Sequence, residues 1–179
     1  MPVPLPNHGA WVAYIYVFLR DIKHISVKID TLDQDFMALI ALRNQLVGLN
    51  YSDPTYDEVE DAMNDAEDAF NDVHGSYLES KLQKIHEAHF PSQEVLLPTA
   101  YMASGYNESV IEEGSYELPM DEGILVDWKP AGQQARKAKL VLVPAPLRFM
   151  LFDGVGLQLL WSTEEEDLFH TPQVHNISE

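Results

Sequence analysis

The chain of 179 residues contains no cysteine. It therefore forms no disulfide, binds no metal through thiolates and uses no cysteine nucleophile. Nothing in this composition indicates an oxidising compartment, and we expect a cytoplasmic protein.

Basic residues are scarce as well. The sequence has 11 Lys and Arg against 29 Asp and Glu, which gives a formal charge of −18. Proteins bind the phosphate backbone of nucleic acids through a basic surface that releases counterions. The acidic excess therefore argues against nucleic-acid binding and favours protein partners with basic surfaces.

Long apolar runs are also missing. The one candidate, AWVAYIYVFL from Ala10 to Leu19, has about half of the roughly 20 apolar residues that a membrane-spanning helix needs. It lacks the basic residues that precede the core of a signal peptide, so we expect no membrane partner. The hydrophobic fraction of 46% is sufficient for a folded core, in one ordinary domain or two small ones.

A long helical pattern occupies the first part of the chain. Apolar residues recur there at alternating spacings of three and four, which is typical of a helix that packs lengthwise on a partner helix. They are Ile15, Phe18, Ile22, Ile25, Ile29, Leu32, Phe36, Leu39 and Leu46. The pattern predicts a helix from about Gly9 to Leu49. The alternative is a hairpin of strands, because residues 11–19 are rich in aromatic and β-branched side chains and residues 25–29 alternate.

A second helix is predicted after a short break. Gly48 and the run from Asn50 to Pro54 end the first helix, because proline excludes the residue before it from helical geometry. Thr55 is predicted to cap the next helix, with Glu58 as its partner in a capping box. The apolar seam of this helix, which shifts by one position near the glycine at 75, consists of Tyr56, Val59, Met63, Ala66, Phe70, Val73, Tyr77, Leu78, Leu82, Ile85 and His89. We therefore expect an antiparallel, coiled-coil-like helical hairpin over residues 1–91.

Short strands are predicted beyond Pro91. They are Gly123–Lys129, Lys139–Val143, Arg148–Phe152 and Val155–Trp161, with a tight turn at Asp153-Gly154. We expect a small, mostly antiparallel sheet in a β-rich lobe over residues 92–161, with no assignment for residues 92–115. Residues 162–179 are acidic and without periodicity, and are predicted to form a mobile tail. The predicted fold class is α+β.

The stretch YDEVEDAMNDAEDAF and the two positions after it carry eight acidic residues and no basic one. Five of them are spaced four, four, three and four apart, so they lie on one face of the predicted helix. They are Asp57, Asp61, Asp65, Asp68 and Asp72. This acidic stripe is either solvated surface, a docking face for a basic partner or a divalent-cation site. A straight helix splays its carboxylates outward and lacks the glycine of a calcium-binding loop.

Positions 129–148 carry five basic residues and no acidic one, namely Lys129, Arg136, Lys137, Lys139 and Arg148. The expected loop at 130–139 either limits the acidic excess or meets the acidic stripe of the same or a neighbouring molecule. Contacts between two different patches on neighbouring copies are heterologous and build rings or filaments. We therefore predict head-to-tail assembly, with the apolar pair Leu168 and Phe169 in the tail as a further docking element.

The segment KIHEAHF is a candidate metal site. Zinc peptidases place two histidines four apart on one helix face, with a glutamate as general base. Here His86 and His89 are three apart, which permits a shared metal but departs from that pattern. The alternative is that His89 ends the apolar seam and His86 lies at the helix surface. No phosphate loop, nucleophile elbow or catalytic carboxylate pair is evident, and we expect no cofactor.

These features favour a non-enzymatic structural or interaction protein, a subunit of a larger assembly that docks on basic surfaces or on copies of itself. A helical hairpin with acids near its tip, followed by a compact β-rich domain, resembles bacterial transcript-cleavage factors in outline, without their sequence motifs. The resemblance implies a hairpin that carries Asp53, Asp57 and Glu58 to RNA polymerase, which is the first alternative. A metal-dependent hydrolase that uses the two histidines and Glu87 is the second.

Overall fold

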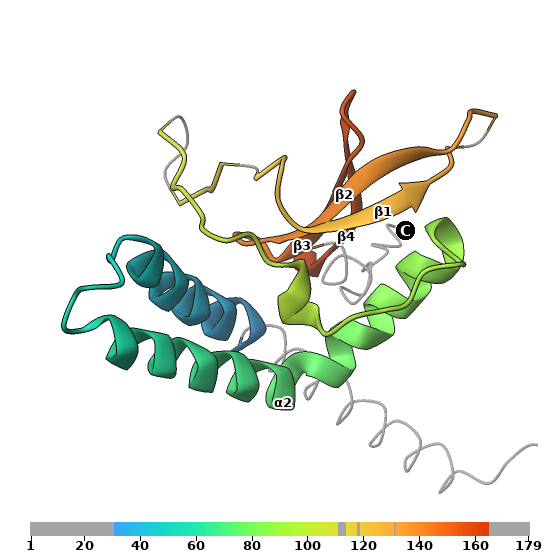
Figure 1. Ribbon diagram of the computed structural model, residues 1–179. Coiled ribbons are helices and arrows are strands. Elements are labelled where there is room, and N and C mark those ends of the chain that lie inside the picture. Colours follow the sequence, from blue (N-terminus) through green and yellow to red (C-terminus); the bar gives the residue numbers. More distant parts are fainter. Residues whose placement is uncertain (1–30, 111–113, 118, 131, 165–179) are drawn as a thin grey trace, which may run out of the picture.

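The computed structural model describes residues 31–110, 114–117, 119–130 and 132–164. In this part of the chain two helices precede a four-stranded antiparallel sheet, which confirms the predicted α+β class. Figure 1 shows both helices on the same side of the sheet. The sheet therefore has one face toward the helices and one face away from them.

Within the described residues the first helix covers 31–47, and α2 covers Tyr56–His89. Asp35 contacts His74, with Oδ2 and Nε2 2.7 Å apart, whereas Arg43 pairs with Glu67. Because the later residue of the first helix meets the earlier residue of α2, the two helices run in opposite directions. Residues 9–30 of the predicted first helix, and the alternative strand hairpin, lie outside the described residues.

The predicted capping box at the start of α2 is wrong. Thr55 occupies the N-cap position, but its side chain makes no capping hydrogen bond. Its hydroxyl and its backbone N–H instead donate to Asp53 Oδ1, at 2.7 and 2.9 Å. These two hydrogen bonds hold the pKa of the Asp53 carboxyl below its ordinary value. The hydrogen bond to Asp53 turns the Thr55 hydroxyl toward the loop, and its oxygen accepts no hydrogen bond from the first turn of α2.

The predicted seam of α2 is correct at its start and wrong at Val73. Phe70 is buried against Phe36, with ring centroids 5.5 Å apart, but Val73 is 61% exposed. His74 takes the buried position instead. From Phe70 to His86 buried residues recur at a spacing of four, with Gly75 and Ile85 buried beside them, and a stripe at this spacing turns slowly around the helix. The first half of α2 therefore faces the first helix and the second half faces the sheet.

The sheet has the order β1-β2-β3-β4, with all neighbours antiparallel. Its strands are β1 Ile124–Trp128, β2 Arg136–Val143, β3 Arg148–Phe152 and β4 Leu157–Ser162. All four predicted strands are present. The expected loop at 130–139 is too long, because Arg136 to Lys139 belong to β2 and pair with β1. The turn between β3 and β4 is at Asp153-Gly154, where Gly154 has a φ of +83°.

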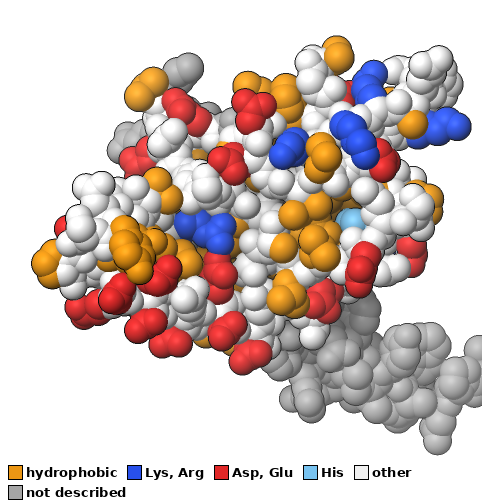
Figure 2. Space-filling view, in the orientation of Figure 1, with side chains coloured by type: hydrophobic (Ala, Val, Ile, Leu, Met, Phe, Trp, Pro, Cys, Tyr) orange, Lys and Arg blue, Asp and Glu red, His pale blue; other side chains and the backbone are white. Residues whose placement is uncertain are grey.

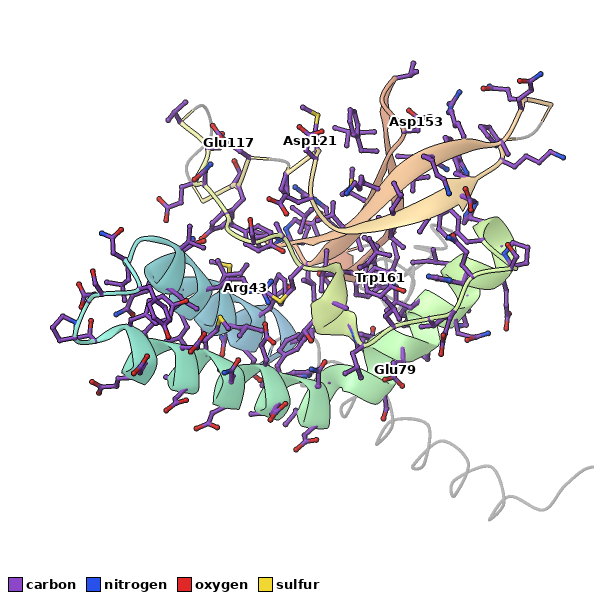
Figure 3. All side chains as sticks on the ribbon, viewed as in Figure 1. Arg43, Glu79, Glu117, Asp121, Asp153 and Trp161 are labelled. Atoms are coloured by element: carbon purple, nitrogen blue, oxygen red, sulfur yellow. The ribbon has the colours of Figure 1, made fainter. Side chains whose placement is uncertain are left out.

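One buried cluster joins the helices to the sheet. The 3-10 helix η1, Pro98–Tyr101, places the Tyr101 ring 6.0 Å from the Phe149 ring of β3. Trp161 of β4 lies between the sheet and α2 (Figure 3), where its ring is 6.3 Å from the Tyr77 ring. Residues of the first helix, α2, η1 and all four strands belong to the same core. The helical part and the β-rich part are thus packed together by apolar contact.

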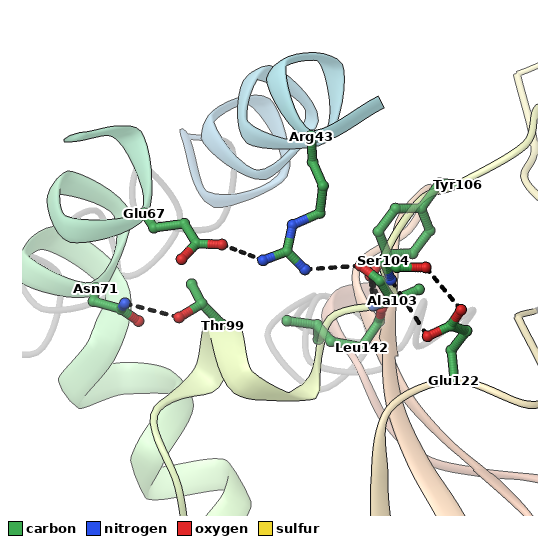
Figure 4. Close-up of polar contacts among 9 residues, drawn as sticks. All are labelled: Arg43, Glu67, Asn71, Thr99, Ala103, Ser104, Tyr106, Glu122 and Leu142. Carbon is green, nitrogen blue, oxygen red and sulfur yellow. Dashed lines mark hydrogen bonds and ion pairs between the residues drawn. The ribbon is translucent and has the colours of Figure 1, made fainter. Parts of the chain in front are cut away.

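Polar contacts fix the first helix to the segment after η1 (Figure 4). Arg43 donates to the Ala103 carbonyl at 2.7 Å while pairing with Glu67. The Asn44 amide both donates to the Tyr106 carbonyl and accepts from its N–H, at 2.7 and 2.8 Å. The buried Tyr106 hydroxyl then donates to the Leu142 carbonyl of β2 at 2.7 Å. Burial raises the pKa of Tyr106, which keeps this hydroxyl protonated as a donor.

Candidate interaction surfaces

The acidic stripe lies on the outer surface of α2. All five aspartates, Asp57, Asp61, Asp65, Asp68 and Asp72, are exposed. None of them forms an ion pair with any residue that the structure describes. Figure 2 shows acidic side chains along the lower left of the molecule, where α2 runs. In this part of the chain the stripe is unneutralised negative charge on a rigid helix.

Two of the five basic residues at positions 129–148 form ion pairs within the described chain, and three do not. Lys137 pairs with Asp127 across β1 and β2, at 2.6 Å. Arg136 pairs with Asp153, and its guanidinium lies 5.1 Å from the Trp128 ring centroid. The remaining three basic residues, Lys129, Lys139 and Arg148, form no ion pair with the described residues. No described ion pair joins the basic segment to the acidic stripe.

Asp153 organises the turn beside this basic segment, at the end of the sheet distant from α2 (Figure 3). Its Oδ1 accepts hydrogen bonds from the N–H groups of Gly156 and Val155, both at 2.9 Å. These bonds, followed by the pairing with Arg136, hold the pKa of Asp153 below its ordinary value. Arg136 therefore serves the structure of the sheet and is a poor candidate for docking.

The sheet face turned away from the helices is apolar, a feature that the sequence analysis missed. Pairing between strands sets one row of four side chains across it, namely Leu125, Lys139, Phe152 and Leu157. The next row on the same face consists of Val141, Met150 and Leu159, of which Val141 and Met150 are buried, so only part of this face is open to solvent. Leu125, Leu157 and Leu159 are 51%, 42% and 41% exposed. Alternation within the strands was the available signal, but without the register it did not show that these residues share a face.

The histidine segment is arranged differently from the sequence-based expectation. His86 is buried, so the prediction that it lies at the helix surface is wrong. Its Nδ1 faces the Gln93 carbonyl at 3.2 Å, and a carbonyl only accepts, so Nδ1 carries the proton. Its Nε2 accordingly accepts from the Tyr101 hydroxyl at 3.1 Å, and the Tyr101 oxygen accepts from the Leu96 N–H at 3.2 Å.

Both ring nitrogens of His86 thus have protein partners, and burial lowers its pKa. His89 is half-buried at the last turn of α2. Among the described residues no group of three or more His, Asp or Glu side chains is placed to hold a metal ion. The described geometry therefore gives the proposed His86 and His89 metal site no support, and it stays a prediction.

A pocket of about 260 Å³ lies between the C-terminal half of α2 and β4. Its lining includes Lys81, Lys84, Ile85, His89, Leu160 and Trp161. The Lys81 ammonium lies 4.7 Å from the Tyr77 ring centroid. Cationic side chains around an apolar floor favour an acidic group over a metal cation.

Two further predictions concern the ends of the helical and β-rich parts. Asp57 and Glu58 are exposed in the first turn of α2, close to the connecting loop. Leu168 and Phe169 lie outside the described residues.

None of the described helices is both long and apolar enough to cross a membrane. Comparison with protein-family models, curated proteins and solved structures finds no match to this chain.

Proposed function

We propose that this protein is a non-enzymatic interaction subunit of a larger assembly, which docks through the acidic stripe of α2 and the free basic residues of the sheet. The observation that carries the proposal is the segregation of charge. Figure 2 shows Asp and Glu side chains along α2 at the lower left and Lys and Arg side chains gathered over the sheet at the upper right. Charge separated in this way steers and orients partners of complementary sign.

The cost of the acidic stripe supports this proposal. Like charges three or four residues apart destabilise an isolated helix by about 0.2–0.5 kcal/mol per pair. The stripe contains four such neighbouring pairs between Asp57 and Asp72, and no described basic residue neutralises them. A basic partner surface would relieve this repulsion, so docking is favoured at this face.

The finer architecture belongs to the same proposal. We infer that the two helices form one projecting hairpin over residues 1–91, and that the tail adds a docking element through Leu168 and Phe169. Partners are then either other proteins with basic surfaces or further copies of this chain. The polymerase-factor and hydrolase alternatives rest on no contact among the described residues.

Affinity purification from the native host tests the proposal. The tagged wild-type chain is compared with a variant in which all five stripe aspartates are changed to Asn. A matched control removes five exposed acids elsewhere, by Glu87→Gln, Glu94→Gln, Glu108→Gln, Glu117→Gln and Asp121→Asn. We expect the wild type and the control to retain the same polypeptides and the stripe variant to lose them. A wild-type chain that retains no polypeptide, its own copies included, overturns the proposal.

A further inference from the structure

The pocket between α2 and β4 gathers positive charge on an otherwise acidic helix. The sequence of α2 contains two Lys or Arg residues, Lys81 and Lys84, and both line this pocket. They are three residues apart, so they lie on one face of the helix. Lys84 is exposed and forms no ion pair with any residue that the structure describes. No Asp or Glu among the described residues lines the pocket, so its rim is positively charged.

The floor of the pocket is apolar. It includes the buried side chains of Ile85 and Trp161 and the half-buried side chain of Leu160. The Lys81 ammonium lies 4.7 Å from the Tyr77 ring centroid, and the Tyr77 ring in turn contacts Trp161. This aromatic contact holds one cation at the edge of the floor. The pocket therefore suits a ligand that carries an apolar side chain with carboxylates beside it.

The chain continues from this pocket into a segment of that kind. Leu160 and Trp161 belong to β4, and the exposed Glu164 follows three residues after Trp161. Glu164 is the first of four successive acidic residues, after which come Leu168 and Phe169. Residues 165–179 lie outside the described residues. An extended chain spans about 3.5 Å per residue, so Phe169 can reach any point within about 28 Å of Trp161. The tail is long enough to return to the pocket.

We propose that this pocket binds the C-terminal tail of its own chain. Leu168 and Phe169 cover the apolar floor, while the acidic residues at 165–167 meet Lys81 and Lys84. The contact removes apolar surface from water and pairs the two lysines with carboxylates. The inference uses the docking element of the proposed function and makes no use of the acidic stripe. A partner that binds Leu168 and Phe169 must first displace them from the pocket.

The tether favours the chain's own tail over other acidic segments. A short flexible connection gives the tethered segment an effective concentration of about a millimolar. An acidic segment of a second copy or of another protein must compete with this concentration. The pocket is therefore an internal site, and its occupation does not depend on the concentration of the protein.

Disulfide formation in the full chain tests the contact, because the natural chain has no cysteine. Ala88→Cys places a thiol on an exposed residue of the pocket lining, and His170→Cys places a second thiol directly after Phe169. Both lysines and the apolar pair stay intact. With oxidised glutathione as the oxidant, we expect an intramolecular disulfide that forms at a rate independent of protein concentration. Mass spectrometry of the unreduced monomer detects it.

The matched control is Gln83→Cys with His170→Cys. Gln83 is exposed and uncharged, and it lies about 140° around the helix from Ala88. We expect this pair to close about tenfold more slowly, because docking does not bring its thiols together. A mixture of chains that carry only Ala88→Cys or only His170→Cys is expected to give little disulfide dimer. Equal closure rates for the two pairs, or efficient dimer formation in the mixture, overturns the inference.

Charge reversal tests the ionic part of the contact. In the chain with Ala88→Cys and His170→Cys, reversal of the pocket or of the tail is expected to slow closure by about three- to tenfold. Combining the two reversals is expected to restore the rate, because opposite charges face each other again. The pocket variant is Lys81→Glu/Lys84→Glu, and the tail variant is Glu165→Lys/Glu166→Lys/Asp167→Lys. Circular dichroism establishes that each variant is folded. A combined variant that closes as slowly as either reversal alone contradicts the proposed pairing.

One substitution in the tail tests the apolar part. Phe169→Ala is expected to slow closure at low salt and also at about 1 M salt, where a Debye length of about 3 Å screens the charges. The control Val174→Ala removes an apolar side chain further along the tail and is expected to leave the rate unchanged. Equal rates for the two variants would show that the floor of the pocket does not bind Phe169.

The two proposals fail in different ways. Equal closure of the Ala88 and Gln83 pairs overturns docking of the tail in the pocket. It leaves the purification experiment with the stripe variant unaffected, because Lys81 and Lys84 are not part of the acidic stripe. Loss of every retained polypeptide in that experiment overturns the proposed function, whereas an internal disulfide between tail and pocket still forms.

Discussion

At the scale of single residues, several buried polar side chains are held by hydrogen bonds to other segments of the chain. His86 is the clearest case, because its two nitrogens bind the Gln93 carbonyl and the Tyr101 hydroxyl. Protonation would place a second N–H against the Tyr101 oxygen, which already accepts from the Leu96 N–H. The arrangement, in which the Tyr101 hydroxyl donates to Nε2, therefore favours the neutral ring, which agrees with a pKa lowered by burial.

This network predicts a loss of stability in mild acid. In the unfolded chain a histidine takes up a proton near pH 6.5, whereas buried His86 resists protonation until a lower pH. The unfolded state thus binds more protons in this window, so the free energy of unfolding falls as the pH drops below about 6.5. Urea titrations at about pH 7.5 and about pH 5 should show this fall in the wild type.

The non-titrating variants His86→Phe and His86→Gln are the controls for that measurement. Both are expected to be less stable at neutral pH, because they disturb the buried network, and to show a smaller fall between the two pH values. Gln retains a donor and an acceptor, so it should lose less stability than Phe. Equal slopes for the wild type and both variants would contradict the prediction.

A glycine at the start of β1 gives a prediction of steric origin. Gly123 has a φ of +85°, and a Cβ placed there would lie 2.3 Å from the Leu140 carbonyl oxygen. Gly154 has a similar φ of +83°, but a Cβ there would have nothing within 4 Å. Gly154→Ala is therefore expected to cost about 1–2 kcal/mol, from left-handed backbone alone.

Gly123→Ala should cost roughly 2–5 kcal/mol, because the close approach adds about 1–3 kcal/mol to the same backbone term. Urea denaturation of both variants, at neutral pH, measures the difference. If the two alanine variants are equally stable, the close approach of β1 to Leu140 is wrong.

At the scale of elements, α2 changes partner along its length. Its first half packs on the first helix through Phe70, and its second half packs on η1 and the sheet through His86 and Tyr77. The change of partner explains why the buried stripe follows a spacing of four and leaves Val73 in solvent. A heptad pattern would have kept one face toward one partner helix.

Two alanine substitutions test this description of α2. Phe70→Ala removes a buried ring and is expected to cost about 3–5 kcal/mol of unfolding free energy. Val73→Ala removes an exposed side chain and is expected to change stability by less than about 0.5 kcal/mol. Thermal or urea unfolding distinguishes them. A cost of more than about 1.5 kcal/mol for Val73→Ala would place Val73 in a core contact, as the heptad pattern predicted.

At the scale of the whole molecule, one continuous hydrophobic core carries an acidic surface on α2 and a separate basic surface on the sheet. The core includes side chains from both helices and all four strands, so loss of either layer exposes the apolar surface of the other. The charges are outside this core, with the acidic stripe on α2 and, among the described residues, the basic side chains without an ion pair on or next to the sheet. Stability and interaction are therefore supported by different surfaces of the same elements.

The shared core predicts a single cooperative transition. A chain with Trp11→Phe and Trp128→Phe retains Trp161 as its one tryptophan, at the junction of the sheet with α2. Its fluorescence reports on the sheet, while far-UV circular dichroism reports mainly on the helices. We expect the two urea transitions to coincide, because small domains with one core unfold as a unit. Separate midpoints would indicate that the helical and β-rich parts unfold independently.

The sequence predicted the order of elements well because local signals are strong where they were used. Pro54 and its neighbours separate the two helices, and Asp153-Gly154 turns β3 into β4, as short-range geometry requires. The strand Arg148–Phe152 was predicted with its observed bounds. The start of β2 was missed because Arg136 to Lys139 is a polar sequence whose strand geometry depends on pairing with β1.

Of the candidate surfaces, the acidic stripe could be predicted from local sequence, whereas the apolar sheet face could not. The acidic stripe follows from the helical period alone, so its five exposed aspartates were named correctly as one face. The apolar sheet face requires the register of four strands, which no local pattern supplies. The burial of His86 could not be predicted because it depends on Tyr101, which lies in a segment without a clear local sequence pattern.

By itself the sequence determined the charge, the α+β order and the positions of the turns, because each depends on residues that are neighbours along the chain. Only the tertiary structure decided which cations are already paired, which helix positions reach the sheet and which leucines face water. Those properties depend on pairs such as Lys137 with Asp127 and Tyr77 with Trp161, which meet only when distant segments pack together.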